Sequence, residues 1–172
     1  GNHTVSVTYT GDDKYKAATA NKTVEVPEDE KTVMTEDLTK VEKGSGSFVA
    51  NFTDAEGNPL ANTKVTFEIN GGTYTRTTDA NGNAGMNINL VPGTYTIKTT
   101  NPVTKESATN TITVLPRFTE DSDLVKYFRN DSQYVLKVLD DDGNPAKAGE
   151  IITYNTNGVF YNRTTNATGH VK

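Results

Sequence analysis

Cysteine is missing from this 172-residue sequence, so neither a disulfide bond nor a thiolate metal site can form. Small extracellular domains commonly rely on disulfides for their stability. This chain must therefore be stabilised by packing, by repetition of similar units or by another kind of cross-link.

Long apolar runs and clusters of basic residues are missing as well. No apolar stretch approaches the ~20 residues of a membrane-spanning helix. No leader pattern opens the sequence, and we interpret Gly1 as an arbitrary start. The net charge is −5, with Lys and Arg interspersed among Asp and Glu. This mixture favours solubility and argues against a nucleic-acid-binding surface.

Helical periodicity is nearly absent, and Ser122–Tyr127 is the one segment where a helical turn is plausible. Alternation with period 2 is frequent instead, as in the apolar positions 48, 50 and 52 or 65, 67 and 69. Such alternation places one face of a strand on a core and the other in water. Hydrophobic residues make up only 33% of the chain, so we expect an ordered β protein with a thin core.

Turn chemistry separates the expected strands, with DAEGNP at 54–59, NGG at 70–72, DANG at 79–82 and PG at 92–93. Gly supplies positive φ, and Asp or Asn supports a turn with side-chain hydrogen bonds. The pattern predicts an all-β sandwich with seven strands between Thr32 and Leu115. Its predicted interior consists of Phe48, Phe52, Val65, Phe67, Ile88, Leu90, Tyr95, Ile97, Ile112 and Val114.

The sequence repeats with a period of about 86–87 residues. DLTK at 37–40 returns as DLVK at 123–126, and DAEGNP at 54–59 returns as DDDGNP at 140–145, both at an offset of 86. YTRTT at 74–78 returns as YNRTT at 161–165 at an offset of 87, which places one inserted residue between Pro59 and Val65. Near the start, VEV at 24–26 aligns with ITV at 112–114.

These offsets predict three parts. Residues 1–26 are the last strands of one repeat, with strands expected at Thr4–Tyr9 and Thr19–Val26. Residues 27–116 form one complete repeat, and residues 117–172 supply the first four or five strands of a third. The two end parts lack complementary strands, so one hypothesis is that the head of one copy completes the tail of another.

The repeated motifs resemble a known family. D-x-x-G-N-P together with PGTYTI at 92–97 is similar to the bacterial immunoglobulin-like repeat, and Cna-B and carboxypeptidase-regulatory-like domains share parts of it. The turn Y-x-G-D-x-x-Y at 9–15 is typical of such repeats. The D-L-x-K opening and VFYNRTTNATG at 159–169 look most like adhesin-like surface proteins of methanogenic archaea. The resemblance implies tandem immunoglobulin-like β-sandwiches at an extracellular cell surface, with no catalytic residue and no cofactor.

Acidic turns offer weak candidates for a metal site. Asp140, Asp141 and Asp142 could supply the oxygen ligands that calcium prefers. However, a distal bidentate Glu is missing, and the matching turn at Asp54 is less acidic. We therefore favour a plain hairpin turn and expect no metal.

The sequence shows no pattern of residues that is typical of a catalytic site. His3 and His170 have no Cys partner and no convincing Ser-His-Asp order, so we interpret them as surface or strand-edge residues. Asp12 and Asp13 lie in a turn with nothing to raise a carboxylate pKa. We expect that the chain is not an enzyme.

Two modifications are conceivable. The six N-x-S/T sequons make the chain a candidate glycoprotein, and Asn51 is expected on the outward face of its strand. A Lys–Asn isopeptide bond between Lys40 and Asn110 could replace a disulfide, as in some Cna-B-like domains, but Glu68 alternates outward and no catalytic acid is evident. The candidate glycosylation sites are Asn2, Asn21, Asn51, Asn130, Asn162 and Asn166.

Two functions remain open at this point. The first is a structural stalk or spacer repeat of an adhesin-like surface protein or fibre, whose partners are neighbouring repeats or subunits. The alternative is a module that binds carbohydrate or a host protein. Sugar binding usually needs exposed aromatic side chains, and of the neighbours Phe160 and Tyr161 one is expected to face outward. One ring is a small platform, so we favour the spacer.

Overall fold

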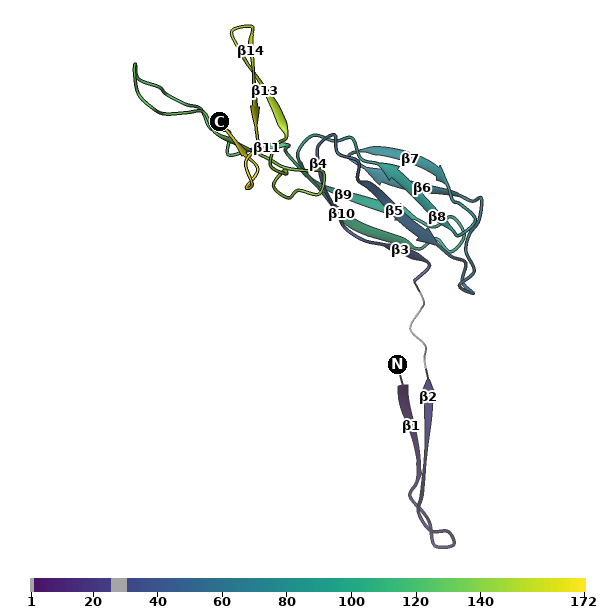
Figure 1. Ribbon diagram of the computed structural model, residues 1–172. Coiled ribbons are helices and arrows are strands. Elements are labelled where there is room, and N and C mark those ends of the chain that lie inside the picture. The colour runs from purple at the N-terminus through teal and green to yellow at the C-terminus, as the bar shows by residue number, and fades with distance from the viewer. Residues whose placement is uncertain (1, 26–30) are drawn as a thin grey trace. The chain divides into compact units, whose positions relative to one another are not determined.

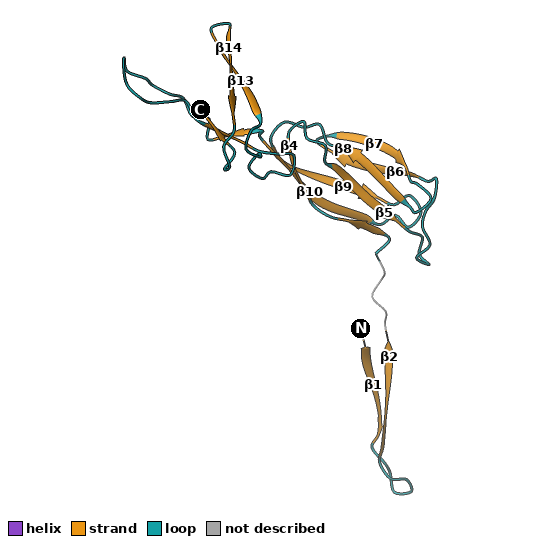
Figure 2. Cartoon of the chain, in the orientation of Figure 1, coloured by secondary structure: helices purple, strands orange, loops and turns teal. Residues whose placement is uncertain are grey.

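The computed structural model describes residues 2–25 and 31–172, and every regular element in these ranges is a β-strand (Figures 1 and 2). The predicted all-β class is confirmed. The helical turn considered for Ser122–Tyr127 is wrong, because this segment is irregular, and so short a helix would need packing partners to form. The chain divides into two compact units, Gly1–Lys31 and Thr32–Lys172.

The first unit is an antiparallel hairpin of β1 (Asn2–Tyr9) and β2 (Ala18–Glu25). Its connection is held by the Asp12 carboxylate, which accepts hydrogen bonds from the backbone N–H groups of Lys14 at 2.9 Å and Tyr15 at 2.7 Å. The expected strands agree with β1 and β2, except that Val26 lies outside the described residues.

The second unit contains a two-sheet sandwich (Figure 1). One sheet has the order β3-β5-β8 and the other the order β4-β10-β9-β6-β7. The strands are β3 (Val33–Thr35), β4 (Leu38–Val41), β5 (Ser47–Phe52), β6 (Lys64–Ile69), β7 (Gly72–Thr77), β8 (Asn83–Asn87), β9 (Gly93–Thr100) and β10 (Ser107–Leu115).

The sandwich has eight strands rather than seven, because the first expected strand is broken. β3 pairs antiparallel with β5 in one sheet, and β4 pairs in parallel with β10 in the other. The Asp37 carboxylate lies at the crossing and accepts hydrogen bonds from Thr111 N at 2.8 Å and Asn110 Nδ2 at 3.2 Å. This carboxylate therefore anchors the point where the chain changes sheets.

The core between the sheets is centred on Phe67. Its ring makes edge-on contacts with Phe48, at 5.9 Å between centroids, and with Phe52, at 6.3 Å. All three side chains are essentially inaccessible to solvent. Eight of the ten predicted interior residues are buried, whereas Leu90 and Tyr95 are only partly buried at the border of the core.

One turn is built four times from the pattern [D/N]-x-x-G-x. In each copy the first side-chain oxygen accepts hydrogen bonds from the backbone N–H groups two and four residues later, and the glycine has φ between 76° and 84°. A positive φ of this size favours glycine. The four turns begin at Asp54, Asp79, Asp140 and Asn166.

The last part of the second unit repeats the opening of the sandwich. Tyr134 and Tyr154 make an edge-on pair at 6.1 Å, as Phe48 and Phe67 do at the corresponding positions. Its strands are β11 (Phe118–Thr119), β12 (Leu136–Val138), β13 (Ile151–Thr156), β14 (Val159–Thr164) and β15 (His170–Val171).

Equivalent hydrogen bonds locate the inserted residue. Leu60 N donates to Phe52 O, and its counterpart Ala146 N donates to Val138 O, at an offset of 86. The next equivalent acceptors are Leu60 O, bonded by the Thr78 hydroxyl, and Lys147 O, bonded by the Thr165 hydroxyl, at an offset of 87. The extra residue therefore lies at Ala146–Lys147, within the predicted interval.

Removing the central ring tests the core. Phe67→Ala should cost about 3–5 kcal/mol, since the cavity would lie between two rigid sheets. Calorimetric melting would show the loss as a lower Tm. Phe160→Ala is the control because this ring is 68% exposed. Equal Tm values for the two variants would contradict the described core.

Acid should weaken the turns. The carboxyl pKa of Asp54 is lowered from 3.8 chiefly by the Asn58 side-chain amide, and that of Asp79 chiefly by the backbone N–H of Asn83. A lowered folded-state pKa gives stability that is present above the unfolded value and lost as pH falls through the folded one.

We therefore expect the Tm of the double variant Asp54→Asn/Asp79→Asn to fall less than the Tm of the wild type when the pH is lowered from about 5 to about 2. The amide keeps the accepting oxygen, as Asn166 shows in its own turn. If the Tm of both proteins fell by the same amount as the pH is lowered, these carboxylates would make no pH-dependent contribution to stability.

Candidate functional site

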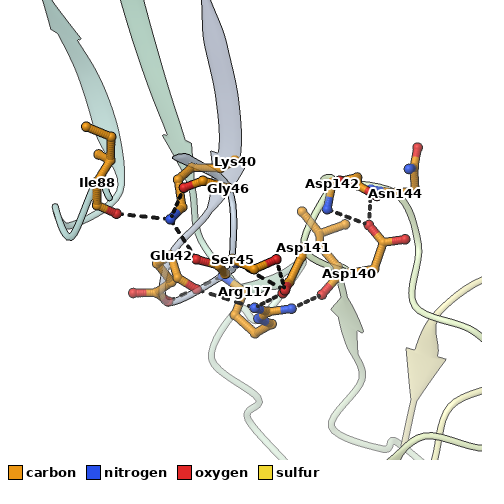
Figure 3. A network of polar contacts seen from close by, with 12 residues as sticks. Lys40, Glu42, Ser45, Gly46, Ile88, Arg117, Asp140, Asp141, Asp142 and Asn144 are labelled. Carbon is orange, nitrogen blue, oxygen red and sulfur yellow. Dashed lines mark hydrogen bonds and ion pairs between the residues drawn. The ribbon is translucent and has the colours of Figure 1, made fainter. Parts of the chain in front are cut away.

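The polar centre of the second unit begins with a buried lysine on β4. Lys40 is 2% exposed, and its Nζ donates hydrogen bonds to the carbonyl oxygens of Gly44 at 2.6 Å, Gly46 at 2.9 Å and Ile88 at 3.0 Å (Figure 3). Three acceptors satisfy the three donors of an ammonium group. Lys40 thus fixes the loop after β4 against the chain that follows β8.

The proposed cross-link partners have different contacts. Asn110 accepts a hydrogen bond from the Thr35 hydroxyl and donates to Asp37, while Lys40 Nζ bonds three carbonyl groups. In the parallel register of β4 and β10, Lys40 lies beside Val114 rather than Asn110. This arrangement does not bring the two side chains of the isopeptide hypothesis together.

A second set of polar contacts joins the sandwich to the strands that follow it (Figure 3). Arg117 donates from Nη2 to the Asp141 carboxylate at 2.6 Å and from Nη1 to Leu139 O at 3.0 Å. The same Asp141 carboxylate accepts hydrogen bonds from the backbone N–H and the hydroxyl of Ser45, both at 3.2 Å. We call Glu42, Ser45, Arg117 and Asp141 the junction clamp.

Backbone contacts support the junction clamp. Glu42 N donates to Leu115 O at 2.8 Å, and Arg117 N donates to the Glu42 carboxylate at 3.3 Å. Val41 N reaches Asp141 O at 3.3 Å. A Cβ on Gly143 would lie 2.8 Å from the Leu115 side chain, so the turn packs closely on the end of β10.

Electrostatic contacts favour the charged form of the Asp141 carboxyl in the junction clamp. The pKa of the Asp141 carboxyl is lowered, first by the hydrogen bond from Arg117 and then by the backbone N–H of Ser45. The side chains of Arg117 and Asp141 remain 27% and 46% exposed, so water screens this pair. Its role is to orient the junction rather than to add much stability.

Two of the three calcium candidates have other tasks in this turn. Asp140 holds the turn by accepting from Asp142 N at 3.1 Å and Asn144 N at 2.9 Å, and Asp141 belongs to the junction clamp. Within the ranges that the structure describes, no three His, Cys, Asp or Glu side chains gather as they would around a metal ion. The arrangement therefore offers no convergent oxygen cage.

The histidines lie apart. His3 is exposed on β1, opposite Val24. His170 on β15 lies 2.9 Å from the Glu120 carboxylate through Nε2 and 2.8 Å from the Thr168 hydroxyl through Nδ1. The contact with His170 lowers the pKa of Glu120.

The sequons occupy different environments. Asn21, Asn130, Asn162 and Asn166 are exposed, and Asn2 is a strand residue whose side chain lies outside the described structure. Asn51 is half-buried, and its Nδ2 donates to Asn81 O and Asn83 Oδ1, both at 2.9 Å. A glycan on Nδ2 of Asn51 would displace hydrogen bonds that already exist there.

The two aromatic residues of β14 lie on opposite faces of the strand. Phe160 is 68% exposed and pairs with Asn155, so it faces outward as expected, whereas Tyr161 pairs with Tyr154 and shares its face but is still 45% exposed. On the matching strand β7, Tyr74 is also 42% exposed. Both strands lie at a sheet edge, where the inner face has little cover.

Among residues 2–25 and 31–172, no helix has the length and apolar character to span a bilayer.

No protein-family model matches the chain, and no curated protein matches it either. Among solved structures, it is similar to one described as a Ca2+-stabilized adhesin that helps an Antarctic bacterium reach out and bind ice. The identity is 20% and the TM-score 0.36, and the match covers 99% of this chain and 48% of that one. A likeness at this level carries no argument about function.

The junction clamp was not foreseen from the sequence. One signal was present, because Asp141 is acidic where the matching turn has the neutral Ala55. The turn itself does not use this side chain, so an acidic residue there indicates a separate role. Its partners lie 24 and 96 residues away, at Arg117 and Ser45, and no local pattern connects them.

Asp141→Ala should loosen the junction while leaving the sandwich folded. Asp142→Ala is the matched control, since its carboxylate has no hydrogen-bond partner among the described residues. Backbone ¹⁵N relaxation should show that the segments on either side of Pro116 tumble more independently in Asp141→Ala alone. Identical relaxation in both variants would show that the carboxylate does not order the junction.

Proposed function

We propose that this chain is a structural spacer made of tandem repeats in an adhesin-like protein of the cell surface, without catalytic activity. The observation that carries the proposal is the junction clamp, in which side chains before and after Pro116 interlock. Such ordered junctions are what a repeat array needs to hold its length. The immunoglobulin-like type and the archaeal origin implied by the motif resemblance belong to the same proposal.

The repeated internal bonds also support a spacer. The glycine turn, the edge-on aromatic pair and the threonine bond recur at offsets of 86–87 residues. The two copies of the repeat therefore share these local contacts. The surface positions that differ between the two copies can favour solubility or carry glycans at the exposed sequons.

One observation favours the alternative binding role. Phe160 and Tyr161 are both exposed on β14, and the Arg163 guanidinium lies 6.0 Å from the Tyr161 ring centre. Aromatic faces with a nearby cation could stack on a sugar or a peptide. A binding module for surface glycans or host proteins is therefore the second candidate.

Two measurements separate the candidates. Concatenated copies of the segment 32–117 that carry Ala55→Asp, which restores the Asp141 carboxylate at each junction, should show a maximum dimension in small-angle scattering that grows linearly with copy number, and the chain should give no signal on a glycan array. A glycan signal that Phe160→Ala or Tyr161→Ala abolishes would favour the binding module instead. A dimension that stops growing with copy number would overturn the spacer.

A further inference from the structure

Asn166 differs from the other sequon asparagines in how its side-chain amide is used. It opens the fourth glycine turn, where its Oδ1 accepts hydrogen bonds from Thr168 N at 2.9 Å and His170 N at 3.0 Å. The turn therefore needs only the oxygen of the amide. Nδ2 has no hydrogen-bond partner among residues 2–25 and 31–172, and the side chain is exposed.

The third residue of this sequon is accessible as well. N-glycosylation requires Ser or Thr two residues after the asparagine. Thr168 is exposed, and its hydroxyl lies 2.9 Å from Asn166 Oδ1 and 2.8 Å from His170 Nδ1. The acceptor nitrogen and the hydroxyl that a transferase recognises thus lie together on one exposed turn.

The exposure of this turn is also seen in the complete sandwich. The counterpart is the turn that opens at Asp79 and connects β7 to β8, with the strands of both sheets present around it. Asp79 takes the place of Asn166 and Asn81 that of Thr168, and both are exposed. Complete sheets therefore leave this turn in water.

Two other sequons are blocked by contacts of their own. Asn51 lies on β5, between β3 and β8, and its Nδ2 already donates two hydrogen bonds, both at 2.9 Å. The sequon at Asn130 has its hydroxyl on Ser132, whose oxygen is buried. In the first case the acceptor nitrogen is engaged, and in the second the hydroxyl is out of reach.

The remaining three sequon asparagines lie within strands. Asn2 belongs to β1, Asn21 to β2 and Asn162 to β14, and each is paired with a residue of the neighbouring strand. Paired backbone is held extended by the ladder. A transferase must enclose the sequon, which is easier at a projecting turn than along a paired strand.

We propose that Asn166 is an N-glycosylation site of the folded chain and that Asn51 is not. The substrate is an oligosaccharide carried on a lipid phosphate, and a separate transferase supplies the catalysis. The electron pair of Asn166 Nδ2 forms a bond to C1 of the sugar while Nδ2 loses a proton. The bond between C1 and the phosphate oxygen breaks, and the phosphate keeps that electron pair. The proposal rests on the cell-surface part of the proposed function, because sequons are used in exported proteins.

The glycan would lie at the end of the repeat that carries the junction clamp. A Cβ on Gly169 would lie 3.0 Å from Pro145 Cβ, so the turn packs beside the loop that follows β12. Asp141 of the same loop belongs to the junction clamp. Glycosylation of Asn166 would therefore place a bulky, solubilising group near the junction.

Transfer of a glycan to the folded chain tests the site. The transferase is one that modifies free peptides of residues 48–55 and 163–170 equally well. With the folded chain as acceptor, mass spectrometry of its glycopeptides should find the glycan on Asn166 and none on Asn51. Asn166→Asp should abolish this product and keep the Tm, because Asp79 builds the same turn with a carboxylate.

Transplanting the sequon tests accessibility in the complete sandwich. Asp79→Asn/Asn81→Thr should add a second glycan, at position 79, because this turn has the same hydrogen bonds as the turn at Asn166. Asp79→Asn alone is the matched control and should add none, since it lacks the hydroxyl residue of a sequon.

Three outcomes would overturn the proposal: no glycan on Asn166 of the folded chain, equal occupancy of Asn51 and Asn166, or a transplanted sequon that stays unmodified. The assay with purified components needs neither export nor an array of repeats. Its failure is therefore distinct from a scattering result that contradicts the spacer.

Discussion

Burial of the Phe67 ring between Phe48 and Phe52 is the contact on which the sandwich depends. No disulfide joins the two sheets, and the three rings pack between them at centroid distances of 5.9 and 6.3 Å. Burying one such side chain contributes about 1.5–3 kcal/mol, a large part of a net domain stability of about 5–15 kcal/mol. The polar features act around this core: the glycine turns set the strand ends, and Lys40 ties the loop after β4 to Ile88.

The segment 117–172 separates local from non-local determinants of the fold. Its glycine turns and the Tyr134–Tyr154 pair form, since their partners lie within the turn or on strands that are present. Residues 124–127 match β4, yet they form no strand. The reason is that β4 has β10 as its neighbour in the sheet, and this repeat has no such strand in the described structure. Even so, Lys126 Nζ bonds Ser132 O at 2.7 Å, as Lys40 bonds Gly46.

Sequence reasoning predicted the features that depend on local pattern. Alternation identified the buried rings at 48, 52 and 67, and turn chemistry identified the loops, because each signal lies within a few residues. It did not predict the break after Thr35, where Asp37 bonds Thr111 on a distant strand. It also missed the junction clamp, whose residues Ser45, Arg117 and Asp141 meet only after the sheets have formed. Parity placed Phe160 on the outward face, but it did not show that Tyr161, on the other face, would stay 45% exposed at a sheet edge.

The glycine turn leaves one of its positions free for the junction clamp. Its geometry needs an accepting oxygen at the first position and glycine at the fourth, so the second position is free to vary. Ala55 and Asp141 both occupy this second position, and the turns around them have the same hydrogen bonds. Only Asp141 has a carboxylate to bind Arg117 and Ser45. An acidic residue at this position therefore adds contacts between the sandwich and the strands that follow it, while the turn keeps its own hydrogen bonds.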